Sequence, residues 1–309
     1  MSLERTASTS AWAGRWALLA ALCAVPLFAF GGAVTTLEAG LAVEGWWNAE
    51  GHFLPFFPIE KWLRDPETFV EHTHRLFGML VGFFALAAVV QSLRVGAGRA
   101  IAAAALLAVC VQGTLGGLRV LEKSSDLAFL HGVFGQGVFA LLACSALLLS
   151  ARWAQDERGA PLAEAPTRMA AWTTGLIYLQ IALGAWYRHG LRPVAAEGVA
   201  GRLHLHLFGA LVVLGAVSAL AARLKASERP ELVRIARQLH ALLGVQLLLG
   251  ALSWIALSSE WAGLELVASV LHVITGALLL ARSLTSALWS RRMAAPDAAG
   301  AATQLGASA

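Results

Sequence analysis

Residues 127–150 read LAFLHGVFGQGVFALLACSALLLS and contain no Asp, Glu, Lys or Arg. At 1.5 Å per residue, a helix of about 20 residues crosses the roughly 30 Å hydrocarbon core of a bilayer. A chain in lipid must satisfy its backbone internally, and this run is too long for the strand of a barrel. It therefore predicts a transmembrane helix that carries one histidine, His131, near its start.

Seven further apolar runs extend this prediction to an all-α integral membrane protein with eight transmembrane helices. Of the 309 residues, 58% are hydrophobic and 14% charged, and the mean hydropathy is +0.67. Soluble domains carry nearer a quarter charged residues. The predicted spans lie near 14–35, 69–91, 99–119, 127–150, 169–188, 203–223, 232–257 and 263–285.

The basic residues sort by loop and predict the topology. With the N-terminus inside, cytoplasmic segments hold 15 of the 23 Lys and Arg residues, which favours both termini in the cytoplasm. We expect an uncleaved first span in the inner (cytoplasmic) membrane of the cell, surrounded by lipid. The net charge of +4 does not indicate a nucleic-acid partner. The three cysteines fall inside spans and predict neither a disulfide framework nor a zinc site.

A short pattern recurs at the outer ends of the odd-numbered spans. Q-x-x-L-G-[GA] occurs at residues 112–117, 180–185 and 246–251, and the first span ends similarly at Gly31 and Gly32. Small residues let membrane helices approach closely. A four-helix unit used twice accounts for the repeat and predicts two pseudo-symmetric four-helix bundles. We divide the chain into a disordered N-terminus (1–13), an N-terminal bundle (14–150, with the outer loop 36–68), a cytoplasmic linker (151–168), a C-terminal bundle (169–286) and a disordered tail (287–309).

Histidines open the four even-numbered spans at one depth. Ionisable groups inside spans usually face the bundle interior with a partner. Imidazole is an axial ligand of haem iron, and facing helices of a bundle commonly hold such a cofactor. We predict that His74 with His131, and His206 with His272, bind haem iron. His204 stays open as the alternative to His206.

Outer arginines are candidates for binding the propionates of such a haem, because guanidinium groups pair well with carboxylates. Arg75, directly after His74, is the one that we assign to cofactor binding; Arg119, Arg188 and Arg202 lie at the same side.

One half carries an acidic group that the other half lacks. Glu71 precedes His74 by three positions, so both project from one helical face, whereas Leu203 stands three positions before His206. This asymmetry predicts chemistry in the first half and cofactor storage or electron relay in the second. Glu71, His74 and His131 are the predicted catalytic residues. The alternative for Glu71 is an ion pair with a basic residue such as Arg75, and the aromatic outer loop is either a lid or an anchored surface segment.

The sequence resembles the haem A synthase family over residues 14–285. The resemblance rests on residues 71–75, which match its E-x-x-H-R motif, on residues 112–117, and on His131, His206 and His272 at the starts of helices. It implies oxidation of a ring methyl of haem O to a formyl group, giving haem A for terminal oxidases. It also implies that the substrate haem O lies between His74 and His131, that haem b is a cofactor between His206 and His272, and that haem O synthase and cytochrome oxidase assembly factors are candidate partners.

Two departures from the family pattern are visible. The first outer loop lacks the cysteine pair of many bacterial members, and Leu207 stands where an arginine often follows the histidine. The second functional hypothesis is a di-haem b membrane cytochrome that transfers electrons from quinol. Haem O synthase itself is excluded because the Asp-rich motifs that would bind magnesium and diphosphate are absent from the sequence. The sequence identifies no electron acceptor.

Overall fold

The structure, a computed structural model, describes the whole chain except residues 1, 96–97, 156–160, 163, 190–197 and 295–309. Its described residues form long helices joined by short connections. These helices are α1 (Ser2–Thr36), α3 (Pro66–Val95), α4 (Arg99–Leu121), α5 (Ser125–Leu148), α7 (Thr167–His189), α8 (Val199–Ala226), α9 (Pro230–Ser258) and α10 (Ala262–Met293). Shorter elements are β1 (Asn48–Ala49), β2 (His52–Phe53), η1 (Leu54–Phe56), α2 (Ile59–Trp62) and α6 (Ala151–Gln155).

Seven of these helices, within the described ranges, are long and apolar enough to cross a membrane. The chain is therefore an all-α, multi-pass integral membrane protein, as predicted. The exception is α7, which was predicted as the fifth span. Its 23 residues include three threonines, a glutamine and two arginines, and these polar residues lower its hydropathy below that of the other helices.

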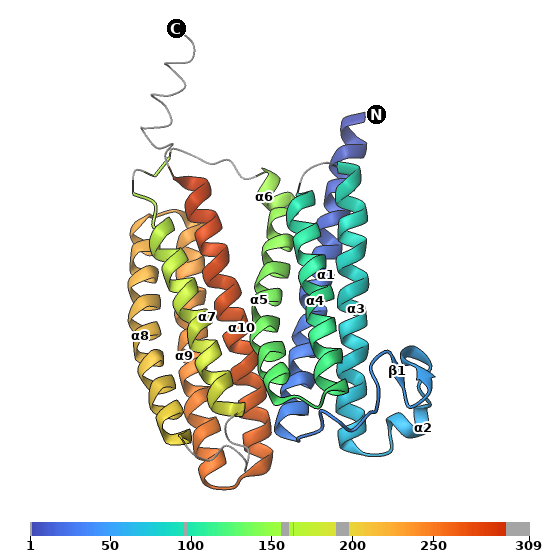
Figure 1. Cartoon of the computed structure of the whole chain (residues 1–309). Coiled ribbons are helices and arrows are strands. Elements are labelled where there is room, and N and C mark those ends of the chain that lie inside the picture. Colours follow the sequence, from blue (N-terminus) through green and yellow to red (C-terminus); the bar gives the residue numbers. More distant parts are fainter. Residues whose placement is uncertain (1, 96–97, 156–160, 163, 190–197, 295–309) are drawn as a thin grey trace.

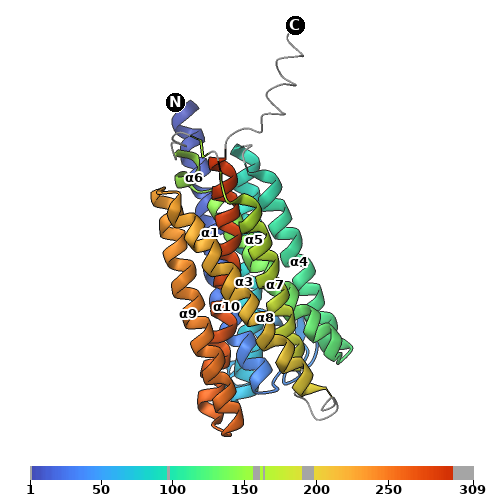
Figure 2. The ribbon, with the colours of Figure 1, turned by 90° about the vertical axis from the view of Figure 1, so that its left-hand side faces the viewer.

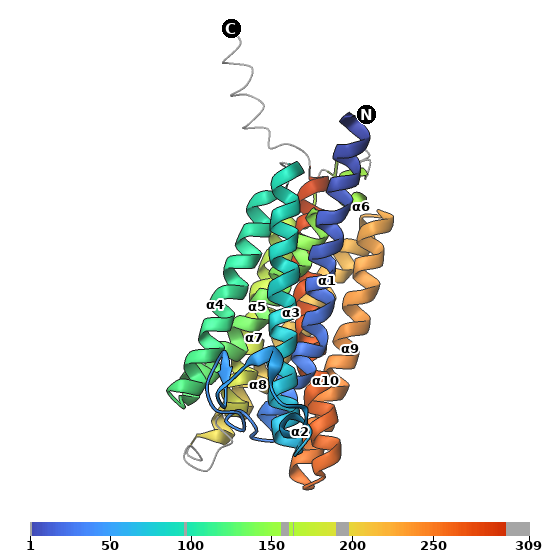
Figure 3. The same cartoon turned by 90° about the vertical axis from the view of Figure 1, so that its right-hand side faces the viewer.

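The long helices lie side by side in two groups (Figure 1). Helices α1, α3, α4 and α5 contact one another in one group, and α7, α8, α9 and α10 form the other. The groups meet through α1 and α5 on one side and α7 and α10 on the other. Views from the two sides show all helices running close to one common direction (Figures 2 and 3). Consecutive long helices alternate in direction, so α1 begins at the end of the bundle where α10 finishes (Figure 1).

Apolar side chains fill the helix contacts and also cover the outside. Leu220, Leu224, Ile235 and Leu239 are fully buried between helices of the second group. Other large apolar side chains on the long helices, among them Phe83, Leu107, Phe208 and Leu211, are largely exposed. An apolar exterior is costly in water but suits a hydrocarbon solvent, so this surface matches the membrane assignment.

Both predicted disordered ends are helical where the structure describes them. Helix α1 begins at Ser2, because residues 2–13 contain neither Gly nor Pro to interrupt the helix that continues into the first span. Helix α10 continues to Met293, because Trp289 is buried and packs edge-on against Trp153 of α6, with ring centroids 4.8 Å apart. The rest of the predicted tail, residues 295–309, lies outside the described residues.

Replacement of Trp289 tests this packing. The indole is 1% exposed, so we expect Trp289→Ala to lower the free energy of unfolding by about 3–5 kcal/mol through lost burial and a new cavity. Thermal unfolding of the purified protein in detergent measures the effect. The matched control is Trp172→Ala on α7, where the side chain is 76% exposed. Equal unfolding midpoints for the two variants would contradict a buried Trp289.

Candidate functional site

Four histidines form two pairs with nearly identical geometry. The rings of His74 on α3 and His131 on α5 have centroids 6.3 Å apart and planes at 75°. Those of His206 on α8 and His272 on α10 have centroids 6.4 Å apart and planes at 74°. Each pair joins two helices of the same group, so the structure brings together all four histidines that were predicted to work in pairs.

The remaining histidines lie elsewhere. His204 is exposed, whereas His206 is half-buried and faces His272. His52 lies in β2 beside Phe57, and Nδ1 of His240 contacts the carbonyl oxygen of Ala236 within α9. His72 is buried under the outer loop. Among the described histidines, it is therefore these four rings that oppose one another across a helix group.

Each paired imidazole lies against a glycine of the long helix that precedes its own. A side-chain carbon would lie 2.8–2.9 Å from the ring atom Cε1 at three of these glycines, closer than such atoms approach in proteins, and 3.0 Å from it at Gly250, a contact tighter than most. Only glycine therefore lets the ring reach the helix backbone. The four contacts are Gly31 with His74, Gly116 with His131, Gly184 with His206 and Gly250 with His272. The repeat that contains these glycines predicts close helix packing but not their contact with the histidine rings, which depends on the neighbouring helix.

The backbone one turn before each glycine orients the ring. Nδ1 of His74 donates to the carbonyl oxygen of Leu27 at 3.0 Å. Nδ1 of His131 and of His272 donate in the same way to Gln112 and Gln246, at 3.2 and 3.1 Å, and His206 bonds to the backbone of Gln180. Because a carbonyl oxygen can only accept, Nδ1 of His74 and of His272 carries the proton, and Nε2 keeps the lone pair that can bind a metal. Beside Nδ1 of His131 and of His206 lie also the carboxamide nitrogens of Gln112 and Gln180, at 3.1 and 2.9 Å.

Three of the four sites add a glutamine carboxamide. The amide nitrogens of Gln112 and Gln180 donate to the backbone oxygens of His131 and His206, at 2.9 and 2.8 Å, and that of Gln246 lies 3.2 Å from Nε2 of His272. The three Oε1 atoms are buried and have no hydrogen-bond partner among the described residues. At the fourth site the equivalent residue is Leu27, so His74 is held by the carbonyl contact without a carboxamide.

The paired rings are suited to a metal that brings its own equatorial ligands. A ligating nitrogen stands about 2 Å from the metal and the imidazole centroid roughly 1 Å behind it, so two axial imidazoles separate their centroids by roughly 6 Å. Both observed separations agree with that value. No group of three or more His, Cys, Asp or Glu side chains that could hold a bare ion occurs in the described part of the chain. The arrangement can therefore hold a haem, whose porphyrin supplies the other four ligands.

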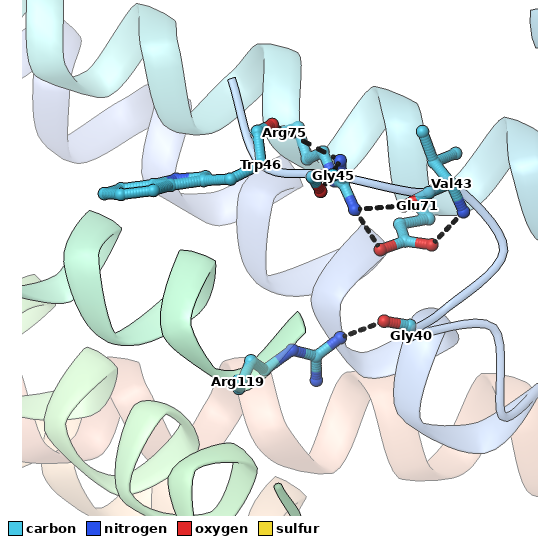
Figure 4. A network of polar contacts seen from close by, with 7 residues as sticks. All are labelled: Gly40, Val43, Gly45, Trp46, Glu71, Arg75 and Arg119. Atoms are coloured by element: carbon cyan, nitrogen blue, oxygen red, sulfur yellow. Dashed lines mark hydrogen bonds and ion pairs between the residues drawn. The ribbon is translucent and has the colours of Figure 1, made fainter. Parts of the chain in front are cut away.

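Glu71 and Arg75 attach the outer loop to α3 (Figure 4). The buried carboxylate of Glu71 pairs with Arg75 at 2.6 Å and accepts a hydrogen bond from the backbone N–H of Val43 at 2.8 Å. Arg75 also donates to the carbonyl oxygens of Val43 and Gly45, at 2.7 and 2.9 Å. Both carboxylate oxygens and both terminal nitrogens of this pair are thus engaged with each other or with the loop. The ion pair that was the alternative for Glu71 is present.

A second arginine holds the same loop to α4. Arg119 donates to the carbonyl oxygen of Gly40 at 2.9 Å (Figure 4). The indole of Trp46 covers Gly117 so closely that no side chain fits there. Gly117 follows Gly116, against which His131 lies. The loop is therefore anchored on both α3 and α4 next to the first histidine pair.

The rest of the loop is a compact unit with its own small core. The antiparallel pair β1–β2, η1 and α2 bury Val43, Leu54 and Phe57, and His72 of α3 lies between the rings of Phe57 and Trp62. Two surface ion pairs add to this. Lys61 beside Glu50 holds the pKa of that carboxyl below its usual value. Hydrogen bonds from Arg64 and Thr68 lower the pKa of Asp65, which caps α3, to about 2.

The two groups of helices also meet near the pairs. Arg188 of α7 donates to the hydroxyl of Thr36 and to the carbonyl oxygen of Gly32 on α1. Gly32 follows Gly31, which contacts His74, and Gly32 itself packs against Val270, two residues before His272. Helix α1 therefore contacts the surroundings of both pairs.

These features define a multi-pass helical membrane protein with two half-buried histidine pairs, the first of which lies next to an anchored outer loop. Residues 14–197, more than half of the chain, match the sequence model of the COX15–CtaA family, described as cytochrome oxidase assembly protein. The chain belongs to this family of cytochrome oxidase assembly proteins, which confirms the predicted resemblance to the haem A synthase family. The match includes Glu71, His74 and His131 and ends before His206. A comparison with curated proteins gave no match.

Glu71→Gln tests the loop anchor. Removing one partner of a buried ion pair costs about 3–5 kcal/mol, so we expect the backbone amides of residues 42–46 to exchange hydrogen much faster in this variant. Hydrogen-exchange mass spectrometry of the purified protein measures this. Glu50→Gln is the control because it removes the partly exposed pair with Lys61, for which about 0–1 kcal/mol is expected. Unchanged protection of residues 42–46 in Glu71→Gln would show that the carboxylate does not hold the loop.

Proposed function

We propose that the protein is a haem A synthase, which oxidises a ring methyl of haem O to a formyl group for use in terminal oxidases. Membership of a family of cytochrome oxidase assembly proteins gives the biological setting. The observation that carries the proposal is the asymmetry between two otherwise equivalent histidine pairs. Only the first pair has the acidic Glu71 on its helix and the anchored outer loop at its end.

The substrate haem O would bind between His74 and His131, and haem b between His206 and His272. Leu27 stands beside His74 where a glutamine stands beside each of the other three histidines, and this difference supports the assignment of substrate to the first pair and cofactor to the second. A substrate must enter and its product must leave. This favours the site in which one iron ligand, His74, is held by the carbonyl contact alone. A resident cofactor is better held where both ligands have a carboxamide as well, because outer contacts of this kind typically contribute 10–100-fold in metal affinity.

Bound haem would supply the redox-active iron, while the protein orients it. The carbonyl contacts would orient the rings, and the glycines would set how closely each ring approaches the preceding helix. Arg75 and Arg119 are committed to the loop in this structure, so Arg75 would contribute to cofactor binding chiefly through the loop that it positions. Arg188, which contacts α1 through one terminal nitrogen, and Arg202 are the remaining candidates for the propionates.

Glu71 would assist the oxidation as a negative charge near the reacting methyl group. Its oxygens are engaged by Arg75 and Val43, so the carboxylate can accept a proton only when one of these contacts opens. Movement of the outer loop would then be coupled to the chemistry, and the loop would act as both an anchor and a lid.

The finer topology forms part of the proposal. We assign α7 as a further span, the fifth in chain order, which brings the total in the described residues to eight. Its 23 residues equal the length of α4, and it packs against α5, α8 and α10. The common geometry of the two histidine pairs supports a repeated four-helix unit. The charge bias supports cytoplasmic termini in the inner membrane. Haem O synthase, as the source of the substrate, and cytochrome oxidase assembly factors, as recipients of the product, are the proposed partners.

A di-haem b cytochrome that transfers electrons from quinol is the second candidate function. The observation that favours it is the near identity of the two ring separations and angles, since an electron relay needs two sites of one kind and no acidic group.

Pigment analysis distinguishes the two functions. The protein is co-expressed with a haem O synthase in a host that lacks haem A, and the extracted haems are separated by chromatography. We expect haem A with the natural sequence. Glu71→Ala and Glu71→Gln should reduce haem A by about a hundredfold or more, the scale of a lost acid–base or electrostatic group, while haem stays bound.

Glu50→Gln is the control, with an expected yield of haem A like that of the natural sequence. Haem b alone in every preparation would overturn the synthase and support the relay cytochrome.

The second pair can be tested without turnover. His206→Ala removes a proposed iron ligand, so we expect haem binding at the second site to weaken by more than the 10–100-fold typical of losing an outer contact. The visible spectrum and the haem content of the purified protein measure this. The control is His204→Ala, which replaces an exposed side chain two residues away and should leave the spectrum and the haem content unchanged. The opposite result would make His204 the ligand.

A further inference from the structure

A group of arginines lies at the end of the bundle opposite the outer loop. Glu231, near the start of α9, is 10% exposed at its side chain and contacts Arg152 of α6 and Arg234 of its own helix. Arg282 of α10 lies 4.0 Å from the same carboxylate. We call Arg152, Arg234 and Arg282 around Glu231 the inner arginine cluster. It joins α6, which follows the first helix group, to two helices of the second.

The charges of this cluster do not balance. Three guanidinium groups face the single carboxylate of Glu231 among the described residues, which leaves two positive charges in excess. The Nε–H of Arg282 is buried and has no hydrogen-bond partner there. A guanidinium offers five N–H donors, and a buried donor without an acceptor is costly. The cluster therefore has both the charge and the N–H donors to bind a further anionic acceptor.

The cluster is open to the membrane surface rather than sealed. The side chains of Arg152 and Arg234 are 48% and 50% exposed. Trp153, next to Arg152, stacks under the guanidinium of Arg292 at 4.3 Å, and tryptophan is enriched at the headgroup level of membranes. Figure 1 shows α6 at the level where α1 begins and α10 ends. An acceptor can thus approach from the headgroup layer.

We propose that the inner arginine cluster binds the phosphate of an anionic phospholipid of the inner leaflet. Arginine binds phosphate through paired, charge-assisted hydrogen bonds, and basic pockets between transmembrane helices on the cytoplasmic side bind anionic headgroups. The phosphate would supply the acceptor for Arg282 and offset the excess charge. Because Arg152 lies on α6, which follows the first helix group and contacts it, and Arg234 and Arg282 lie in the second group, the lipid would also hold the two groups together. The proposal does not use the histidine pairs and stands or falls apart from the proposed function.

Lipid titration of the full chain tests this. The protein is purified in a neutral detergent, stripped of lipid and titrated with phosphatidylglycerol, with phosphatidylcholine of the same acyl chains, or with inorganic phosphate, while the thermal unfolding midpoint is recorded. We expect phosphatidylglycerol to raise the midpoint and the other two to have little effect at equal concentration. Arg282→Gln and the half-exposed Arg234→Gln should each weaken the response to phosphatidylglycerol about tenfold or more, the scale of a charged hydrogen bond.

Arg223→Gln is the matched control, because the ion pair of that arginine is with the exposed Glu164 at the surface. Its response to phosphatidylglycerol should equal that of the natural sequence. Equal effects of the two lipids, or an unchanged response in both cluster variants, would overturn the proposal. An equal effect of inorganic phosphate would assign the cluster to a soluble anion and overturn the lipid assignment. Arg234→Gln keeps the test valid if Arg282→Gln fails to fold.

Discussion

The close contact between an imidazole ring and a glycine backbone, repeated four times, is the constraint on which the rest of the site depends. Glycine lets the ring touch the neighbouring helix, and the carbonyl oxygen one turn earlier then lies within reach of Nδ1. Together these contacts orient each ring and set the separation of each pair. The helices must therefore pack at one depth and one spacing in both groups, since a shift of one turn would lose both contacts at once.

Several features of this arrangement follow from the sequence alone. Lipid requires long apolar helices, so the spans could be read from composition, and α7 departs only because its polar residues dilute that signal. Histidines recurring at the starts of alternate spans predicted the pairs. The role of Gly116 and its counterparts could not be read, because it depends on which ring of another helix faces them. The buried end of α10 also escaped prediction, since Trp289 is held by Trp153, more than 130 positions earlier in the chain.

Glu71 shows how one residue can satisfy two interpretations of a motif. In E-x-x-H-R the carboxylate lies on the face of His74, as its spacing requires, yet the same helix places Arg75 four positions after Glu71, where an ion pair forms. The second carboxylate oxygen of Glu71 and the other terminal nitrogen of Arg75 bond to the loop, through Val43 and Gly45. The motif thus has a structural role, to hold the loop, in addition to any role in chemistry. Any reaction that needs Glu71 must act through a carboxylate that also holds the loop, so chemistry and loop position cannot vary independently.

The two helix groups are tied at both ends by arginine. At the outer end Arg188 reaches from α7 to Gly32 and Thr36 of α1, and at the inner end Arg152 reaches Glu231 of α9. Bonds at the two ends of long, parallel helices resist sliding and tilting of one group against the other far better than a single central contact would. These contacts therefore restrain movement of one histidine pair relative to the other. Under the proposed function, this restraint would serve electron transfer between the pairs, whereas the movement that substrate exchange requires would be confined to the first pair, where Leu27 stands in place of a glutamine.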